Sequence, residues 1–167
     1  MTMKKSLLLR LKRIKLLATD VDGVLTDAGM YYSENGDELK KFNTRDGMGL
    51  VLLRNAGIKL AIVTSEDTRI VERRAAKLKV SDLFQGVRDK VAALETLMKR
   101  HSLKWEEVAY IGDDVNDLEV MKRVGFAAAP ADATDANKEA AHYVTKKKGG
   151  EGCVRELCDL ILGQIQG

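Results

Sequence analysis

Short apolar runs alternate with segments of helical periodicity along most of the chain. The runs that predict strands lie at residues 16–18, 60–63, 83–84, 108–111, 126–128 and 143–144. Strands that alternate with helices are typical of a parallel sheet covered by helices. The pattern therefore predicts an α/β fold with a doubly wound, mainly parallel, Rossmann-like sheet and helices on both of its faces.

The segments between these runs carry apolar residues at helical spacing. The expected helices span residues 47–55, 68–78, 91–100, 118–124 and 154–165. In the second of them, Ile70, Val71, Ala75 and Leu78 fall on one face. The chain contains no linker, repeat or low-complexity tract, so we expect a single domain over residues 1–167.

Two segments depart from this alternation. Residues 30–42 contain Asn35-Gly36 between two extended runs, a strong signal for a β-hairpin inserted after the first strand. Gly149 and Gly150 precede the last expected helix. Because neighbouring glycines make the backbone permissive, residues 147–153 are expected to be mobile and able to approach a ligand closely.

Composition and charge narrow the class of protein. Hydrophobic residues make up 45% and charged residues 32% of the chain, as in globular proteins, and the formal net charge is only +3. This charge does not by itself indicate nucleic acid, and the basic runs are expected on solvated faces. No apolar run suits a signal peptide or a membrane span. We therefore expect a cytoplasmic protein with no nucleic-acid or membrane partner, in which Cys153 and Cys158 are reduced structural thiols.

Polar residues capable of chemistry follow the predicted strands. The first strand is followed by Asp20-Val21-Asp22-Gly23 and the second by Thr64, whereas Lys90 follows the weaker strand at 83–84. Gly112-Asp113-Asp114, with Asp117 beyond it, follows the strand at 108–111. Each motif alone also occurs in ordinary turns and helix starts. Their order matters more, because ligands bind at the carboxyl ends of parallel strands.

Several carboxylates at one edge of a sheet repel one another unless a cation offsets their charge. Since the set offers oxygen ligands and no cluster of histidines or thiols, it favours Mg²⁺ over Zn²⁺. We expect Asp20, Asp22 and Asp113 to bind the metal. Asp114 and Asp117 are expected either as further ligands or as supports of the ligands.

The same set suits hydrolysis of a phosphate monoester through an aspartyl-phosphate intermediate. Asp20 ends its strand and is the expected nucleophile. Asp22 is expected to protonate the leaving group and then to activate water as a general base. Thr64, with the backbone N–H groups that follow it, is expected to bind the phosphate, and Lys90 to supply a fixed positive charge.

The ordered motifs resemble the haloacid dehalogenase superfamily of phosphohydrolases. The resemblance rests on Asp20 with Asp22, Thr64, Lys90, and Asp113 with Asp114, and it extends over nearly the whole chain. It implies the Rossmann-like sheet of that superfamily. Because the hairpin is the only insertion after the first motif, it also implies a member without a cap domain.

Further segments resemble a narrower family, the phosphatases of 3-deoxy-2-ulosonic acid phosphates. These segments are residues 42–47, 108–114, 149–152 and 155–156. The family includes phosphatases of 3-deoxy-D-manno-octulosonate 8-phosphate, a precursor of lipopolysaccharide, and related phosphatases of KDN and N-acylneuraminate 9-phosphates. The resemblance implies a small-molecule sugar acid phosphate as substrate. It also implies a homotetramer in which hairpins associate and a neighbouring subunit helps to close each site.

By the same resemblance, the substrate-binding residues are Thr64, Ser65, Glu66, Arg74, Lys77, Gly149 and Gly150. The family commonly has Thr-Gly where this chain has Thr64-Ser65, and serine keeps the backbone donor. Arg74 suits a sugar-acid carboxylate through a bidentate pair. Glu66 with Lys77 resembles the nonulosonate type, but a solvated helix face explains these two equally well, so both substrate types stay open.

Other classes fit the motifs less well. A phospho-accepting receiver module also uses Asp, Thr and Lys, but it has no counterpart of Gly112-Asp113-Asp114. A relative kept only for oligomerisation is disfavoured, because Asp20, Asp22 and Lys90 are all present. A phosphomutase is disfavoured because an uncapped site admits water to the aspartyl-phosphate.

Overall fold

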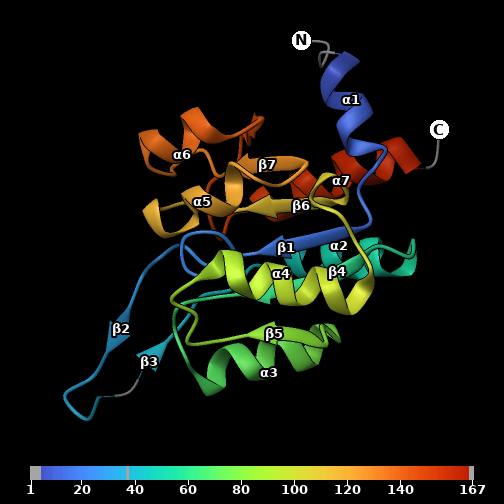
Figure 1. The fold of residues 1–167 in the computed structure, drawn as a ribbon. Helices are drawn as coiled ribbons and strands as arrows, with labels where there is room; N and C mark the ends of the chain where they lie inside the picture. Colours follow the sequence, from blue (N-terminus) through green and yellow to red (C-terminus); the bar gives the residue numbers. More distant parts are fainter. Residues whose placement is uncertain (1–4, 37, 166–167) are drawn as a thin grey trace.

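A six-stranded parallel sheet forms the centre of the computed structural model, which describes residues 5–36 and 38–165. The strand order is β5-β4-β1-β6-β7-β8 (Figure 1). The strands are β1 Leu16–Thr19, β4 Lys59–Val63, β5 Asp82–Phe84, β6 Val108–Ile111, β7 Phe126–Ala129 and β8 Tyr143–Val144. All five pairings between neighbours are parallel. The predicted doubly wound sheet is therefore confirmed.

The register of the central strands brings the predicted motifs to one edge. β1 lies between β4 and β6, and Thr19 is paired with Ile62 on one side and Ile111 on the other. The chain leaves each of these strands within two residues of that row. The strand order also reverses between β1 and β6, which is where open α/β sheets bind ligands.

Helices cover both faces of the sheet. Their bounds are α1 Lys5–Leu11, α2 Thr44–Asn55, α3 Arg69–Leu78, α4 Lys90–His101, α5 Leu118–Met121, α6 Asp135–Ala140 and α7 Cys153–Ile165, with 3₁₀ turns η1 Trp105–Glu107 and η2 Val115–Asp117. Side chains of β1 alternate between two cores, with Leu17 facing α2, α3 and α7, and Leu16 facing α4 and α5. Among the described residues, no helix has both the length and the apolar character needed to cross a membrane.

Two helices were not predicted from the sequence. α1 lies within the basic N-terminal run, and α6 is only six residues long. Thr134 caps α6 by accepting a hydrogen bond from the backbone N–H of Asn137. α5 is shorter than expected because the chain turns after Met121 to bring the Gly125 N–H to the Trp105 carbonyl, at 2.7 Å.

The predicted hairpin is present between β1 and α2. Its strands, β2 Tyr31–Tyr32 and β3 Glu38–Leu39, pair antiparallel, and Gly36 has a φ of 79° in the turn. Figure 1 shows the hairpin projecting away from the sheet. A bridge between Thr26 and Phe42 closes its base against the loop that follows β1. The hairpin is thus joined to the part of the chain that carries Asp20 and Asp22.

The glycine-rich segment packs against the same loop. The Gly150 N–H donates to the Val24 carbonyl at 2.9 Å, and its carbonyl accepts from Asn43 Nδ2 at 3.1 Å. A Cβ on Gly149 would lie 2.0 Å from the Gly23 carbonyl oxygen, so a side chain there would collide with backbone. The structure shows the segment in this docked position, and its mobility stays a prediction.

Candidate active site

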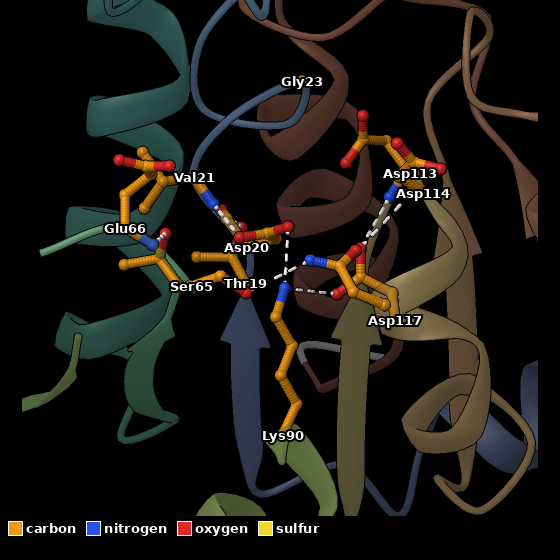
Figure 2. Close-up of polar contacts among 12 residues, drawn as sticks. Thr19, Asp20, Val21, Gly23, Ser65, Glu66, Lys90, Asp113, Asp114 and Asp117 are labelled. Atoms are coloured by element: carbon orange, nitrogen blue, oxygen red, sulfur yellow. Dashed lines mark hydrogen bonds and ion pairs between the residues drawn. The ribbon is translucent and has the colours of Figure 1, made fainter. Parts of the chain in front are cut away.

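Asp20 lies at the carboxyl end of β1, at the floor of a cavity. It is 5% exposed, its Oδ1 accepts from the Val21 N–H at 2.7 Å, and its Oδ2 is 2.8 Å from Lys90 Nζ. Figure 2 shows its carboxylate pointing toward Lys90, with Asp113 and Asp117 facing Asp20 from the loop after β6. The structure therefore brings the predicted nucleophile, the lysine and the carboxylates that follow β6 into one group.

Lys90 is a buried cation held by two carboxylates. It is the first residue of α4, which Asp89 caps by accepting from the Ala92 N–H. Its ammonium lies 2.8 Å from Asp20 Oδ2 and 2.6 Å from Asp117 Oδ1. Burial lowers the pKa of Lys90, but the two carboxylates more than offset this and raise it above its usual value. The lysine is therefore charged at neutral pH.

Asp117 is a support that fixes its neighbours. It is fully buried, and its Oδ1 accepts from Lys90 and from the Tyr110 hydroxyl. Its Oδ2 accepts from the backbone N–H groups of Asp113 and Asp114, at 3.1 and 3.4 Å. A Cβ on Gly112 would lie 2.4 Å from the Asp117 carboxyl carbon, so glycine is required beside it. This arrangement holds both Lys90 and the loop after β6.

The sequence reasoning missed Tyr110. It lies in the apolar strand β6 and is fully buried, and burial raises the pKa of its hydroxyl well above the usual value. The hydroxyl therefore stays protonated and donates to Asp117. A tyrosine in an otherwise aliphatic buried strand was the available signal, because a buried hydroxyl needs a partner.

The carboxylates leave a surplus of negative charge. Asp20, Asp113 and Asp117 each place an oxygen within 4.8 Å of the others. Burial and the charge of Asp117 raise the pKa of Asp20 to about 8 and that of Asp113 to about 7, with Lys90 opposing both shifts. Such shifts mean that one lysine does not neutralise the group. An all-oxygen donor set with uncompensated charge fits Mg²⁺, and Asp20 and Asp113 are placed to hold it, because both line the cavity.

Asp22 lies apart from this acidic group. Its Oδ1 is 2.6 Å from Lys40 Nζ, and its side chain is 26% exposed. In the structure the Asp22 carboxylate is paired with Lys40, whereas Asp20, Asp113 and Asp117 form the acidic group. The predicted role of Asp22 as a metal ligand stays a prediction. Lys40 was not predicted, because the hairpin was considered only as an insertion.

Gly23 allows the two acidic loops to meet. It has a φ of +80°, and a Cβ on it would lie 1.9 Å from Asp113 Oδ2. Both the backbone conformation and the close approach therefore require glycine. This explains why glycine follows the acidic pair in the first motif.

A cavity of about 250 Å³ opens above these groups. The predicted residues that line it are Asp20, Asp22, Thr64, Ser65, Glu66, Asp113 and Asp114, and the residues not predicted are Ala28, Val115 and Asn116. Thr64 is buried, and its Oγ1 accepts from the Glu66 N–H at 3.3 Å. Asn116 Nδ2 donates to Ser65 Oγ at 3.3 Å, which links the loops after β4 and β6 across the cavity.

Four predicted substrate-binding residues lie outside the cavity lining. Arg74 on α3 sits over the Phe42 ring at 5.2 Å and donates to the Asn43 carbonyl at 3.0 Å, so it holds the start of α2. Lys77 is exposed on the same helix. Gly149 and Gly150 pack behind the loop after β1. Their roles in substrate binding stay predictions.

Known proteins are similar to this chain in sequence over most of its length. The family model of the haloacid dehalogenase-like hydrolases matches residues 79–157. The 3-deoxy-D-manno-octulosonate 8-phosphate phosphatase of Yersinia pestis is 46% identical over 153 residues, which cover 92% of this chain and 82% of that protein. The corresponding phosphatase of Escherichia coli K12 is 44% identical over 151 residues, covering 90% and 80%.

Solved structures of similar sequence have the same fold. The 3-deoxy-D-manno-octulosonate 8-phosphate phosphatase of Moraxella catarrhalis, in complex with magnesium, phosphate and KDO, matches with a TM-score of 0.93 at 40% identity, over 95% of this chain and 91% of that one. The cobalt-bound deoxy-D-mannose-octulosonate 8-phosphate phosphatase of Haemophilus influenzae matches with a TM-score of 0.91 at 40% identity, over 94% and 92%.

Proposed function

The chain belongs to the haloacid dehalogenase-like hydrolases, and we propose that it is a Mg²⁺-dependent phosphatase of 3-deoxy-D-manno-octulosonate 8-phosphate, acting in lipopolysaccharide precursor synthesis. The observation that carries the proposal is the buried contact of Asp20 with Lys90, opposite Asp113, at the floor of the cavity. The identity to phosphatases of this substrate over nearly the whole chain supports the choice of substrate. Residence in the cytoplasm is part of the proposal, since both cysteines are free thiols.

Each residue of the site has its own role in the proposed reaction. Asp20 attacks phosphorus, the bond to the leaving oxygen breaks, and Asp22 gives that oxygen its proton. Water, deprotonated by Asp22, then attacks the aspartyl-phosphate, which releases phosphate and restores Asp20. Lys90 offsets negative charge on the transferring group, and the Thr64 hydroxyl donates to a phosphate oxygen. Asp20 and Asp113, together with Asp22 as predicted from the sequence, would hold Mg²⁺, which would supply the positive charge that lets a carboxylate approach a phosphate dianion.

A comparison of sugar acid phosphates tests the substrate. With Mg²⁺ present, we expect kcat/KM for 3-deoxy-D-manno-octulosonate 8-phosphate to exceed that for KDN and N-acylneuraminate 9-phosphates by at least ~10-fold, the discrimination that a few substrate contacts supply. Phosphate release in steady state is the measurement. Turnover of p-nitrophenyl phosphate without turnover of any sugar acid phosphate would contradict the proposed substrate but not the proposed phosphatase activity.

A nonulosonate 9-phosphate is the alternative substrate. Glu66 lines the cavity, and with Lys77 it resembles the nonulosonate-type phosphatases. The alternative holds if the 9-phosphates are preferred in the same comparison and Glu66→Gln reduces that preference. A receiver module does not fit this chain, because the chain belongs to a family of hydrolases.

A homotetramer formed through the hairpin is the remaining part of this proposal. Tyr32 and Leu39 are 67% and 66% exposed, and Met30 and Tyr31 are exposed beside them. Apolar side chains gathered on one projecting element are typical of a contact surface. We expect a tetramer in analytical ultracentrifugation, and monomers or dimers after Tyr32→Glu combined with Leu39→Asp.

Leu9→Asp is the matched control for the hairpin variant. Leu9 is 54% exposed on α1, in another part of the chain, so this change should leave the tetramer intact. If a neighbouring subunit completes the site, the hairpin variant also loses kcat/KM and Leu9→Asp does not. A monomeric wild-type protein, or a tetramer that survives the hairpin changes, would contradict this part.

A further inference from the structure

Two neighbouring lysines at the base of the hairpin contact two carboxylates of the loop after β1. Lys40 Nζ lies 2.6 Å from Asp22 Oδ1, and Lys41 Nζ lies 2.9 Å from Asp27 Oδ2. The pairs differ in their surroundings, since the Lys40 side chain is 0% exposed and the Lys41 side chain is 59% exposed. Water screens the exposed pair, whereas the buried ammonium is fixed against its partner.

The hairpin determines where the Lys40 ammonium lies. The bridge between Thr26 and Phe42 closes the base of the hairpin two residues after Lys40. The Lys40 ammonium also lies 3.6 Å from Met30 Sδ, on the outgoing side of the hairpin. Lys40 therefore reaches Asp22 from a separate element, 18 residues away in the chain.

Asp22 needs such a partner to keep one orientation. Its side chain lines the cavity and is partly exposed. A short carboxylate side chain at a cavity wall has several rotamers open to it, and proton transfer requires one of them to be held within hydrogen-bond reach of the reacting oxygen. A fixed ammonium at 2.6 Å selects one rotamer before the substrate arrives.

We propose that Lys40 is a positioning residue that holds the Asp22 carboxyl group in the orientation in which it exchanges protons with the leaving group and with water. This inference rests on the proposed function, because it takes Asp22 as the general acid and base. Asp22 gives its proton to the leaving oxygen as the phosphorus–oxygen bond breaks, and its ionised carboxylate remains paired with Lys40. It regains a proton from the attacking water, and Lys40 keeps its own proton throughout.

The dependence of the rate on the leaving group tests this role. Release of an alkoxide needs the proton of Asp22, whereas p-nitrophenolate leaves without one. Lys40→Met keeps the apolar stem and removes the ammonium. In single turnovers at saturating substrate, we expect it to slow release of the sugar acid from 3-deoxy-D-manno-octulosonate 8-phosphate by ~10–100-fold, the range of general acid catalysis, and release of p-nitrophenolate by less than ~3-fold. Lys40→Arg should restore part of the loss.

Three controls separate positioning from folding and from the proposed function. Lys41→Met removes the neighbouring exposed pair and should leave both rates unchanged. Asp22→Asn should show the same selective loss as Lys40→Met. Unchanged release of p-nitrophenolate shows that a variant is folded, and Lys40→Gln takes its place if Lys40→Met does not fold.

The outcomes that overturn the inference are distinct. If Asp22→Asn is selective for the alkyl substrate and the Lys40 variants lose both rates equally, or neither, positioning by Lys40 is refuted and the proposed function stands. If Asp22→Asn slows both substrates equally, Asp22 is not the general acid, and both the positioning role of Lys40 and this part of the proposed function fail. If the wild-type protein turns over neither substrate, both fail as well.

Discussion

Asp20→Asn is expected to lower kcat by at least ~10⁴-fold, because an amide cannot form the aspartyl-phosphate. The variant should stay folded. Lys90 keeps Asp117 as a partner at 2.6 Å, and the change removes one of the carboxylates that crowd the buried group. Phosphate release with Mg²⁺ and the melting temperature without metal are the two measurements.

Asp27→Asn is the matched control for the nucleophile. Asp27 lies in the same loop, partly exposed and paired with the exposed Lys41, outside the acidic group. Its change should keep kcat within ~3-fold of the wild-type value, because exposed pairs contribute little. If Asp20→Asn keeps a kcat above ~1% of the wild-type value, Asp20 is not the nucleophile, since loss of a nucleophile lowers kcat by several orders of magnitude.

Removal of Mg²⁺ should abolish turnover and make stability depend on pH between 6 and 8.5. The pKa values of Asp20 and Asp113 are raised to about 8 and about 7, above the usual value of 3.8. The folded, metal-free protein therefore holds these protons more tightly than the unfolded chain does. Their contribution to stability is largest at acidic pH and is lost as the pH rises through 7 and 8. In EDTA, the melting temperature at pH 6 should exceed that at pH 8.5.

Mg²⁺ should reverse this trend, because it neutralises the ionised carboxylates. At about 100 times its dissociation constant, a ligand stabilises the folded state by ~2.7 kcal/mol, which for a chain of this size is a rise in melting temperature of ~5–10 °C. The rise should be larger at pH 8.5 than at pH 6, and smaller in Asp113→Asn. Equal melting temperatures at the two pH values in EDTA would contradict the surplus of negative charge.

The strands could be predicted because buried strands consist mostly of apolar residues, which are visible in the sequence. A central parallel strand is covered on both faces, so β1, β4 and β6 appear as continuous apolar runs of the right length. α1 and α6 could not, since helices of seven and six residues are too short to show a clear helical period. Their stability comes from packing against the sheet, which leaves a weak pattern in the chain.

The candidate site, too, could be predicted from the sequence only in part. The placement of Asp20, Lys90 and Asp113 together followed from parallel strands, whose carboxyl ends must share one edge. The contacts of Lys40 with Asp22 and of Tyr110 with Asp117 did not follow. They depend on the directions of the side chains and on how the hairpin folds back, and the hydrophobic pattern of the sequence shows neither.

The amino-acid order by itself determined the fold class and the edge of the sheet that carries the candidate site, and it singled out Asp20 as the expected nucleophile. These follow from local rules, namely burial, strand direction and the chemical type of the side chains at strand ends. Only the tertiary structure decided which carboxylates form the acidic group and which is paired elsewhere, with Asp117 in the group and Asp22 on Lys40. It also placed Arg74 and Gly149 outside the cavity lining. These outcomes depend on distances of a few ångströms between segments far apart in the chain, and such distances are set when the whole core packs.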